Sequence, residues 1–389
     1  MAAARVLIIG GGIGGLCAAI ALGQRGIEPR VFEQADSLRE VGAGLTVWTN
    51  AVKVLIGLGV AEAVIARASI NERFQLRTWR GDVLNETRPG DLGRRFGAPS
   101  IIVHRAELLR ELALALAPDV VCLGARCIGF EQHPDGVTAR FANGSEHRGD
   151  VLIGADGLHS FVRAQLKGDS RTRYAGYTCW RALAEFESEA LSPGLGFEAW
   201  GRGTRFAMHH CGPGRIFWYA TRNAPEGAGD GPRGRKQDVL DTFSGWHEPI
   251  PSVISATDDA GILRNDIVDR KPIRNWGRDR VTLLGDAAHP MTPNFGQGAC
   301  QAIEDAEALA GCLRGATDFS AALRFYEAGR RDRTAFVTNA SRQVGAISQW
   351  ENPLLCWLRN LITRTGLARS LTLKQFERML AYELPDPVS

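Results

Sequence analysis

Two glycine-rich segments carry residues suited to hold a phosphate-bearing ligand. The first is Gly10-x-Gly12-x-x-Gly15, which directly follows an apolar run at residues 5–9 that predicts a buried parallel strand. The first glycine allows a tight turn, the second lets the backbone approach a phosphate, and the third lets the following helix pack closely on the strand. Because the amides and dipole at that helix N-terminus favour an anion, this segment predicts a bound pyrophosphate.

A second predicted strand, residues 29–33, ends in Glu33, at the distance where such folds place an acid that binds ribose hydroxyls. The alternative is a tight strand–helix turn without any ligand. So many glycines, Gly14 included, would destabilise such a turn, because glycine loses the most conformational freedom on folding. We therefore expect a nucleotide at this end of the predicted sheet.

The second segment lies far along the chain, where an apolar run at residues 281–284 is followed by Gly285-Asp286 and then by Pro293. Gly296-Gln297-Gly298 comes next and opens a predicted helix. The segment thus offers a carboxylate, a proline and a glycine loop, and a chain that has both segments is expected to bind FAD. That Asp286 only caps a helix remains the alternative.

Composition and charge narrow the class of protein. The chain has 389 residues, 44% of them hydrophobic and 23% charged, which is typical of a globular protein with room for two domains. A net charge of +3 is too small to indicate nucleic-acid binding. The eight cysteines show no metal-binding spacing, so we expect no metal and a reducing, cytoplasmic location. The uncharged run at residues 6–24 fits the dinucleotide turn better than a transmembrane segment.

The elements that must position these residues predict an α/β fold. Between residues 177 and 268 the sequence pattern changes to alternating, aromatic-rich predicted strands. This pattern is typical of a mostly antiparallel sheet with one face free to line a cavity. We therefore expect a discontinuous Rossmann-like FAD-binding domain at residues 1–73, 101–176 and 269–330. An inserted β-sheet substrate domain is expected at 74–100 and 177–268, and a C-terminal helical region at 331–389. Ligands in such architectures sit at the seam between the units.

The chain resembles the class A FAD-dependent aromatic hydroxylases, which have the 4-hydroxybenzoate hydroxylase fold. Besides the two glycine segments, Asp156-Gly157 with Ser160 and Arg163 resembles the family motif that serves both FAD and the reductant. Residues 177–181 and 296–305 are most similar to the branch of urate, salicylate and 3-hydroxybenzoate hydroxylases and zeaxanthin epoxidase. Cys300, where the family usually has Asn, is a departure from which we expect little effect.

The resemblance implies a monooxygenase with non-covalent FAD, NADH or NADPH as a transient reductant, and O2 as co-substrate. A flavin C4a-hydroperoxide would pass one oxygen atom to an aromatic or alkene substrate. No nucleic-acid partner is expected, and the protein would be a monomer or a homodimer. The residues implied to contact FAD are Gly10, Gly12, Gly14, Gly15, Glu33, Arg39, Gly44, Arg105, Cys127, Asp156, Gly285, Asp286, Pro293, Gly296, Gln297, Gly298 and Ala299.

The substrate-site prediction combines strand alternation with the same resemblance. A period of two places Arg205 and His209 on one face of a predicted strand, and it gives Tyr219 a shared face with Phe217 on another. Arg205 matches an arginine of the urate hydroxylase branch, and Pro293 would border the flavin edge where oxygen reacts. The predicted catalytic residues are thus Arg205, His209, Tyr219 and Pro293. Structural alternatives remain open, including an Arg205 paired on the outer face of the sheet.

Two other functions compete with this interpretation. An alkene reductase of the geranylgeranyl reductase type shares the fold but consumes no O2. A flavin-free binding protein of the same fold is the non-enzyme alternative, and it would be colourless when purified. Oxygen uptake coupled to NAD(P)H oxidation separates the leading prediction from the reductase.

Overall fold

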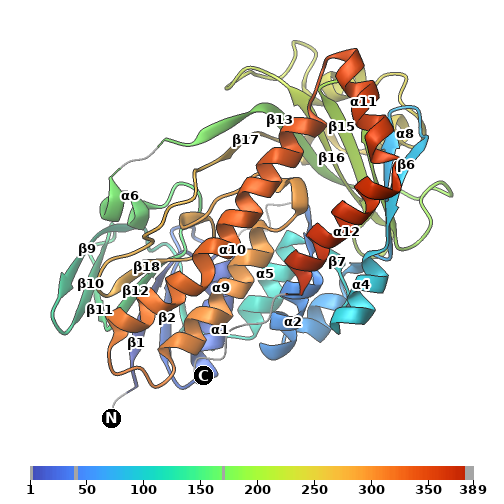
Figure 1. Ribbon diagram of the computed structural model, residues 1–389. Helices are drawn as coiled ribbons and strands as arrows, with labels where there is room; N and C mark the ends of the chain where they lie inside the picture. The colour runs from blue at the N-terminus through green and yellow to red at the C-terminus, as the bar shows by residue number, and fades with distance from the viewer. Residues whose placement is uncertain (1–2, 39–42, 169–170, 382–389) are drawn as a thin grey trace.

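A parallel sheet forms the base of the molecule in this computed structural model, which describes residues 3–38, 43–168 and 171–381 (Figure 1). Its strand order is β18 (Val281–Leu283), β12 (Val151–Gly154), β1 (Arg5–Ile9), β2 (Glu28–Phe32) and β8 (Val121–Cys122). β1, β12 and β18 are almost continuously apolar and almost wholly buried, as expected of parallel strands covered on both faces.

Helices cover one face of this sheet, and a small antiparallel sheet lies beside the other. α1 (Ile13–Gly23) follows β1 and packs closely against α9 (Gly298–Leu313), and α5 (Arg105–Leu114) packs on α1. The small sheet contains β9 (Cys127–His133), β10 (Gly136–Phe141) and β11 (Glu146–Gly149). The predicted α/β, Rossmann-like unit is therefore confirmed.

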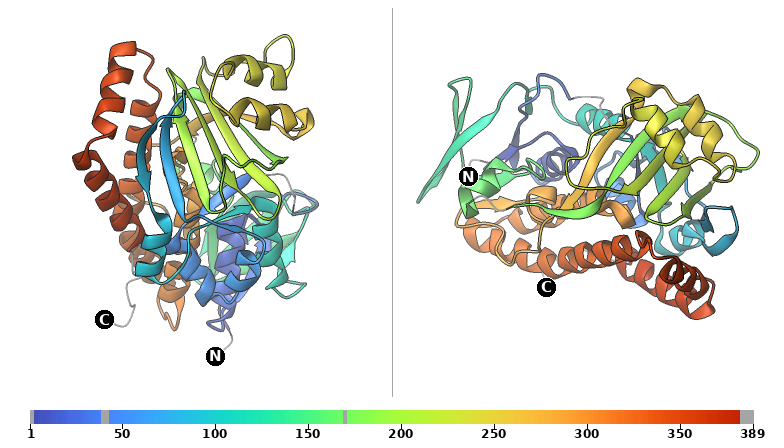
Figure 2. Two further views of the ribbon diagram at one scale, coloured as in Figure 1. Left: turned by 90° about the vertical axis from the view of Figure 1, so that its right-hand side faces the viewer. Right: turned by 90° about the horizontal axis from the view of Figure 1, so that it is seen from above.

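A seven-stranded sheet forms the second unit, which lies above the first in the left view of Figure 2. Its order is β17 (Leu263–Asp269), β13 (Arg173–Glu185), β16 (Arg215–Asn223), β15 (Thr204–His210), β14 (Leu195–Trp200), β5 (Arg73–Thr78) and β6 (Val83–Thr87). All neighbours are antiparallel except β14 and β5, so the prediction of a mostly antiparallel sheet is confirmed.

The two faces of this sheet have different partners. Trp180, Phe206 and Trp218 on one face are fully buried in a cluster with α7 (Arg235–Thr242) and α8 (Ile250–Ala256). The other face turns toward the parallel-sheet unit. Strand alternation thus separates a packed face from a face that is free to bind a ligand.

The remaining elements connect and flank the two units. A three-stranded sheet of β3 (Gly44–Val47), β7 (Ile101–His104) and β4 (Ser69–Ile70) lies between them. The shorter helices are α2 (Thr49–Gly57), α3 (Ala61–Ile65), α4 (Pro89–Phe96) and α6 (Phe161–Lys167), with 3-10 turns η1 (Asp259–Gly261), η2 (Gly285–Ala287) and η3 (Pro293–Phe295).

One long helix joins both units and leads to the C-terminal helices. α10 (Phe319–Ser348) runs from the parallel-sheet unit to the seven-stranded sheet, and α11 (Pro353–Thr363) and α12 (Gly366–Leu380) follow it (Figure 1). α10 continues without a break through residue 330, where the sequence placed the start of the C-terminal region. Within the described ranges, every helix is too short or too polar to cross a lipid bilayer.

Candidate active site

A cavity of about 580 Å³ lies between the two units. Its walls come from the start of α1, from β3, from the first residue of α5, from the free face of the seven-stranded sheet and from the loop between β18 and α9. Segments from widely separated parts of the chain therefore meet at one site, at the seam that the sequence predicted.

The three motif glycines at α1 have distinct geometric roles. Gly10 has a φ of +111°, and a Cβ atom there would lie 2.4 Å from the carbonyl oxygen of Ala155. A Cβ on Gly15 would lie 2.0 Å from the carbonyl oxygen of Gly10. A Cβ on Gly12 would meet no protein atom within 4 Å, and Gly12 lines the cavity together with Gly14. The outer glycines therefore permit packing, while the middle one leaves room for a ligand.

A second helix also begins at the cavity. Gly298 and Ala299, the first residues of α9, belong to its wall, and Gly296 before them has a φ of +62°. The first turns of α1 and α9 contain no acidic residue. Both helices therefore direct unpaired amides and the positive ends of their dipoles into one space, which suits a ligand with negative charge at two places.

Asp286 supplies the only carboxylate among the described residues of the cavity wall. Its side chain makes no hydrogen bond with any described part of the chain. The side chain is open to the cavity, but the surrounding protein limits its hydration and so raises the pKa of Asp286, and the nearby His289 and Arg105 partly oppose this increase. Arg105 lines the same cavity at the start of α5. A carboxylate that faces the cavity and has no partner among the described residues is available for the hydroxyl groups of a ligand.

A buried ionic network holds the Asp286 loop in place. Asp305 on α9 accepts hydrogen bonds from the Gly285 amide at 3.0 Å and from His289 Nε2 at 2.5 Å, and it pairs with Arg330 of α10 at 2.6 Å. Burial by itself would raise the pKa of Asp305, but His289 and Arg330 lower it to about 2. His289 therefore positions the loop from beneath and does not reach the cavity wall formed by the described residues.

The Asp156 motif anchors the same loop from the other side. Asp156 accepts a hydrogen bond from the Ser160 hydroxyl at 2.5 Å and so fixes the start of α6, where Ser160 is the N-cap. Arg163 on α6 donates to the carbonyl oxygens of Ala287 and Ala288 at 2.9 and 3.0 Å. Asp156 itself is outside the described cavity wall, although the residues on either side of it belong to that wall.

Two other predicted cofactor residues lie away from the cavity wall. Glu33 at the end of β2 accepts backbone N–H bonds from Gly11 at 2.7 Å and from Ala35 at 2.9 Å, so it shapes the loop next to the glycine turn. Cys127 is buried at the start of β9, where burial raises the pKa of its thiol. Neither belongs to the described residues that line the cavity. Arg39 lies outside the described residues.

Gln297 and Gly44 also position the site. Gln297 is buried beneath the start of α9, where its side-chain oxygen accepts hydrogen bonds from Asn50 at 3.2 Å and Gln301 at 3.0 Å. Gly44 lines the cavity on β3, and a Cβ there would lie 2.4 Å from the Phe217 ring. Gly44 is thus required where β3 meets the substrate-side sheet.

Arg205 lies inside the molecule and not on the outer face of the sheet. It is 2% exposed and lines the cavity. Its guanidinium pairs with Glu198 at 3.2 Å and donates to Asn294 at 2.9 Å and to Gln349 at 2.8 Å. Because Asn294 directly follows Pro293, the arginine connects the sheet to the loop that begins α9. Sequence alternation gave no sign of these partners.

Tyr219 shares the carboxylate of Glu198. Its hydroxyl donates to Glu198, and burial together with that negative charge raises the pKa of Tyr219 well above its ordinary value. Tyr219 and Phe217 both line the cavity, so the predicted shared face is confirmed. Arg181 also lines it and donates to Asn265 at 2.7 Å. Tyr219 thus remains a neutral donor beside a buried ion pair.

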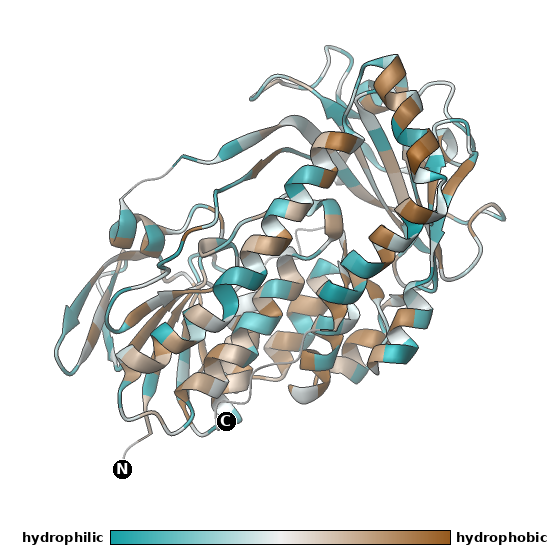
Figure 3. Ribbon diagram, viewed as in Figure 1, coloured by the Kyte–Doolittle hydropathy of each residue, from teal (hydrophilic) through white to brown (hydrophobic). Residues whose placement is uncertain are grey.

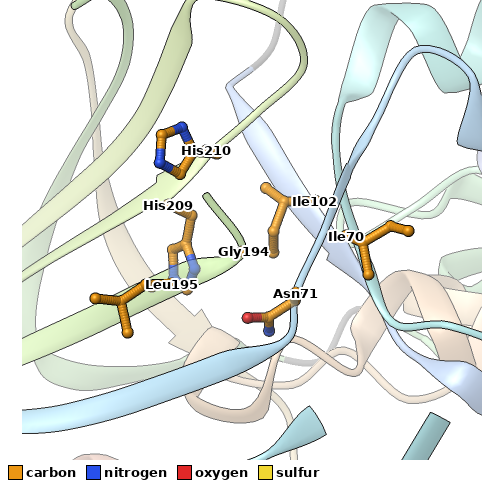
Figure 4. A pocket seen from close by; sticks show the side chains of 8 residues that line it. Ile70, Asn71, Ile102, Gly194, Leu195, His209 and His210 are labelled. Carbon is orange, nitrogen blue, oxygen red and sulfur yellow. The ribbon is translucent and has the colours of Figure 1, made fainter. Parts of the chain in front are cut away.

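His209 is not brought to this cavity. It lies in a small recess with Asn71 and Leu195 (Figure 4), and its ring stacks on Phe74 and Phe217 at centroid distances of 5.6 and 6.3 Å. Burial lowers its pKa to about 4, so it is neutral. Four residues along a strand correspond to about 13 Å, which carries His209 past the cavity although it shares a face with Arg205. We therefore leave it out of the proposed substrate site.

Three residues of the site escaped sequence reasoning. Glu198 had a usable signal, because an acid inside the apolar strand 195–200 requires a buried partner. The only sequence signal for Asn294 was its position beside Pro293. Gln349 had none, because it reaches Arg205 from the far end of α10.

A cavity with two glycine-opened helices, a free carboxylate and an aromatic sheet wall defines a flavoprotein of the 4-hydroxybenzoate hydroxylase class. The chain belongs to the FAD binding domain family, whose model matches residues 3–342. It is 44% identical over 359 residues to the aurachin C monooxygenase/isomerase of Stigmatella aurantiaca, covering 92% of this chain and 93% of that protein.

Two further comparisons agree with this assignment. The FAD-dependent urate hydroxylase of Klebsiella pneumoniae is 36% identical over 367 residues, covering 93% of this chain and 95% of the relative. The structure of Klebsiella pneumoniae HpxO complexed with FAD and uric acid superposes with a TM-score of 0.92 at 34% identity, covering 98% of each chain. The chain is thus an NAD(P)H-consuming, FAD-dependent monooxygenase, and the reductase and binding-protein alternatives are not favoured.

Proposed function

We propose that the enzyme oxygenates an electron-rich planar ring that carries a carbonyl or anionic oxygen. The single observation that carries this proposal is the buried Arg205, which lines the cavity beside Asn294 and Tyr219. A guanidinium fixed by three neighbours presents a directional cationic surface to an oxygen-bearing ring. The uric acid bound by the structural relative has this chemistry.

The cavity residues fit FAD in the following proposed arrangement. The amides of Gly12 and Gly14, with Arg105, would hold the pyrophosphate, and Asp286 would accept a hydrogen bond from a ribityl hydroxyl. The amides of residues 296–299 would contact the flavin, and the N-terminus of α9 would stabilise negative charge on it. Glu33, Arg39 and the main chain near Cys127 serve the adenosine end. When bound and reduced by NADH or NADPH, FAD supplies the activation of O2.

The substrate half of the cavity lies against the seven-stranded sheet. Phe217, Leu263 and Met291 form apolar wall there, while Arg205 and Tyr219 provide polar groups. Apolar walls exclude water and hold the ring by its faces, and the few polar groups set its orientation. Pro293, in the loop that precedes α9, borders the space proposed for the substrate ring. These residues orient the substrate, and their roles are part of the proposal.

Arg205→Gln tests the substrate site. We expect the variant to retain FAD but to lose coupling, so that NAD(P)H oxidation releases hydrogen peroxide instead of oxygenated product. Arg202→Gln, an exposed arginine at the same end of β15, is the matched control and should behave like the parent. Because Arg205→Gln leaves the buried Glu198 carboxylate without its cation and can destabilise the fold, Arg205→Lys is measured beside it. Lysine keeps the charge but cannot reproduce the guanidinium geometry, so it should also uncouple.

If the Arg205→Lys enzyme is fully coupled and its turnover is unchanged, Arg205 is not part of the substrate site.

The substrate itself is best found by a screen of stimulated NAD(P)H oxidation, with product mass as the readout. One O2 should be consumed per NAD(P)H, and the product should gain one oxygen atom. Full turnover without oxygen would favour the alkene reductase instead.

We further propose a cytoplasmic location and a monomer or homodimer. The eight cysteines are all free in the structure, in keeping with a reducing compartment.

We also propose the three-part division of the chain. It comprises the FAD-binding domain at 1–73, 101–176 and 269–330, the substrate domain at 74–100 and 177–268, and the C-terminal helical region at 331–389. Because residue 330 lies within the continuous helix α10, this division assigns residues to the two units and to the C-terminal helices and does not mark cleavable linkers.

A further inference from the structure

The two C-terminal helices turn their apolar side chains outward. On α11 and α12, nine large hydrophobic side chains are exposed, and several are more than half exposed, among them Leu354 (69%), Trp357 (60%) and Leu367 (71%). The brown stretches on these helices in Figure 3 lie on the outside of the molecule. The full set is Leu354, Leu355, Trp357, Leu358, Leu361, Ile362, Leu367, Leu371 and Leu373, which we call the C-terminal apolar face.

The inward face of α11 is the more polar one, which reverses the usual pattern of a surface helix. Arg359 is buried, with its guanidinium donating to the carbonyl oxygens of Ser348 at 2.8 Å and Gly201 at 3.0 Å. Its guanidinium also stacks on Trp200. The helix is thus fixed to the protein by a charged anchor, and its leucines are not needed for that attachment.

The C-terminal apolar face is bordered by positive charge. Four exposed cations lie on α12 and the turn before it, namely Arg364, Arg369, Lys374 and Arg378. Arg369 donates to Asn85 and Arg378 stacks on Phe336, so Arg364 and Lys374 are the two that the described residues leave available to a ligand. The one acidic residue of the two helices, Glu377, is paired with Arg95 of α4. The face therefore combines leucines and a tryptophan with an almost uncompensated positive rim.

We propose that the C-terminal apolar face docks the enzyme on an anionic lipid membrane. Leucine and tryptophan side chains would enter the interfacial region while the cations contact acidic headgroups. α11 has 11 residues and α12 has 15, which correspond to about 17 and 23 Å, so each lies along the surface and does not cross the roughly 30 Å hydrocarbon core.

A second copy of the chain fits this face less well. A symmetric dimer would bring the same positive rim of both copies together, because each patch meets itself across a two-fold axis. Like charges would repel there, whereas acidic lipids provide the complementary charge. The proposal goes beyond the oxygenation reaction and needs no knowledge of the substrate.

Vesicle sedimentation of the FAD-loaded full chain tests the docking. We expect binding to vesicles of phosphatidylglycerol and phosphatidylcholine in equal amounts, much weaker binding to phosphatidylcholine alone, and loss of binding at high salt. The double variant Trp357→Ser/Leu361→Ser should bind the acidic vesicles about tenfold more weakly or worse. Arg364→Gln/Lys374→Gln should bring binding to the level seen with phosphatidylcholine alone.

The matched control is Leu114→Ser/Leu123→Ser, which removes two exposed leucines remote from these helices and should leave vesicle binding unchanged. FAD content and NAD(P)H oxidation in detergent-free buffer should be equal in all variants. No sedimentation of the parent with acidic vesicles would overturn the proposal, as would equal sedimentation of parent and Trp357→Ser/Leu361→Ser. A parent dimer that this double variant converts to monomer, without vesicle binding, would assign the face to self-association instead.

Discussion

At the scale of single residues, three aspartates near one loop differ because of their surroundings. Asp305 is held by His289 and Arg330, and its pKa is lowered to about 2. Asp156 accepts from the Ser160 hydroxyl and the Val162 amide, and so supports the start of α6. Asp286 alone faces the cavity without a described protein partner, and desolvation by the surrounding protein raises its pKa. Identical side chains therefore have three different surroundings: Asp305 anchors a loop, Asp156 supports the start of a helix, and Asp286 faces the cavity.

Asp286→Ala should lower the FAD content of the purified protein. A hydrogen bond to a charged group contributes about 1.5–3 kcal/mol, so FAD binding should weaken by about 10- to 150-fold. The measurement is the ratio of flavin absorbance to protein after dialysis, with titration of FAD into the apoprotein. Asp332→Ala, an exposed aspartate on α10, is the control. Full occupancy of Asp286→Ala after dialysis would refute the role.

At the scale of elements, the site depends on two helices that start at the same cavity. α1 and α9 pack against each other along their lengths, so their N-termini are held side by side. α9 is in turn fixed by α10, because Arg330 is completely buried against Glu304 and Asp305 at 2.6 Å from each. Moving α9 and α10 apart would leave these buried charges unpaired, which is strongly destabilising. The ion pairs therefore fix the positions of the two helices.

Gly12→Ala and Gly15→Ala should separate ligand contact from packing. The Gly12 methyl would project into open cavity, so the apoprotein should unfold at nearly the parent temperature while FAD affinity falls sharply. The Gly15 methyl would lie 2.0 Å from a carbonyl oxygen, so the helix must shift and the apoprotein itself should be destabilised. Thermal melts of apoprotein and FAD titrations measure both effects. Equal destabilisation of the two variants would contradict these assignments.

At the scale of the whole molecule, both units depend on buried groups that acid would protonate. The folded pKa of His209 is about 4 against an ordinary 6.5, so the unfolded chain binds a proton more readily between these values. Asp305 behaves likewise between about 3.8 and 2. In both windows protons favour unfolding, and stability falls as the pH falls.

The enzyme should therefore lose stability stepwise on acidification. From pH 6.5 to 4 the His209 contribution should decline by up to about 1.4 kcal/mol per pH unit, and the Asp305 contribution should follow below pH 4. Urea unfolding of the FAD-loaded protein at several pH values measures this. His209→Gln should flatten the slope between pH 6.5 and 4 only. An unchanged slope in that variant would show that His209 is not the titrating group.

The sequence by itself determined the parts whose physics is local. Neighbouring residues were enough to predict the turn at Gly10, the strand–helix order around it and the carboxylate at Asp286. Backbone conformation and helix capping act over only a few positions, so a local sequence pattern reports them. Strand alternation likewise placed Phe217 and Tyr219 on one face. Together with the motif resemblance, these patterns identified the fold, the cofactor and the reaction class.

Only the tertiary structure decided which side chains meet. Arg205 contacts Gln349, which lies 144 positions along the chain, and its partner Glu198 also accepts from Tyr219. Such contacts depend on how two sheets and a long helix pack, and no local pattern encodes that geometry. His209 shares a face with Arg205 but does not line the cavity. Strand alternation predicts the side of the sheet to which a side chain points, but not how far along the strand the cavity extends.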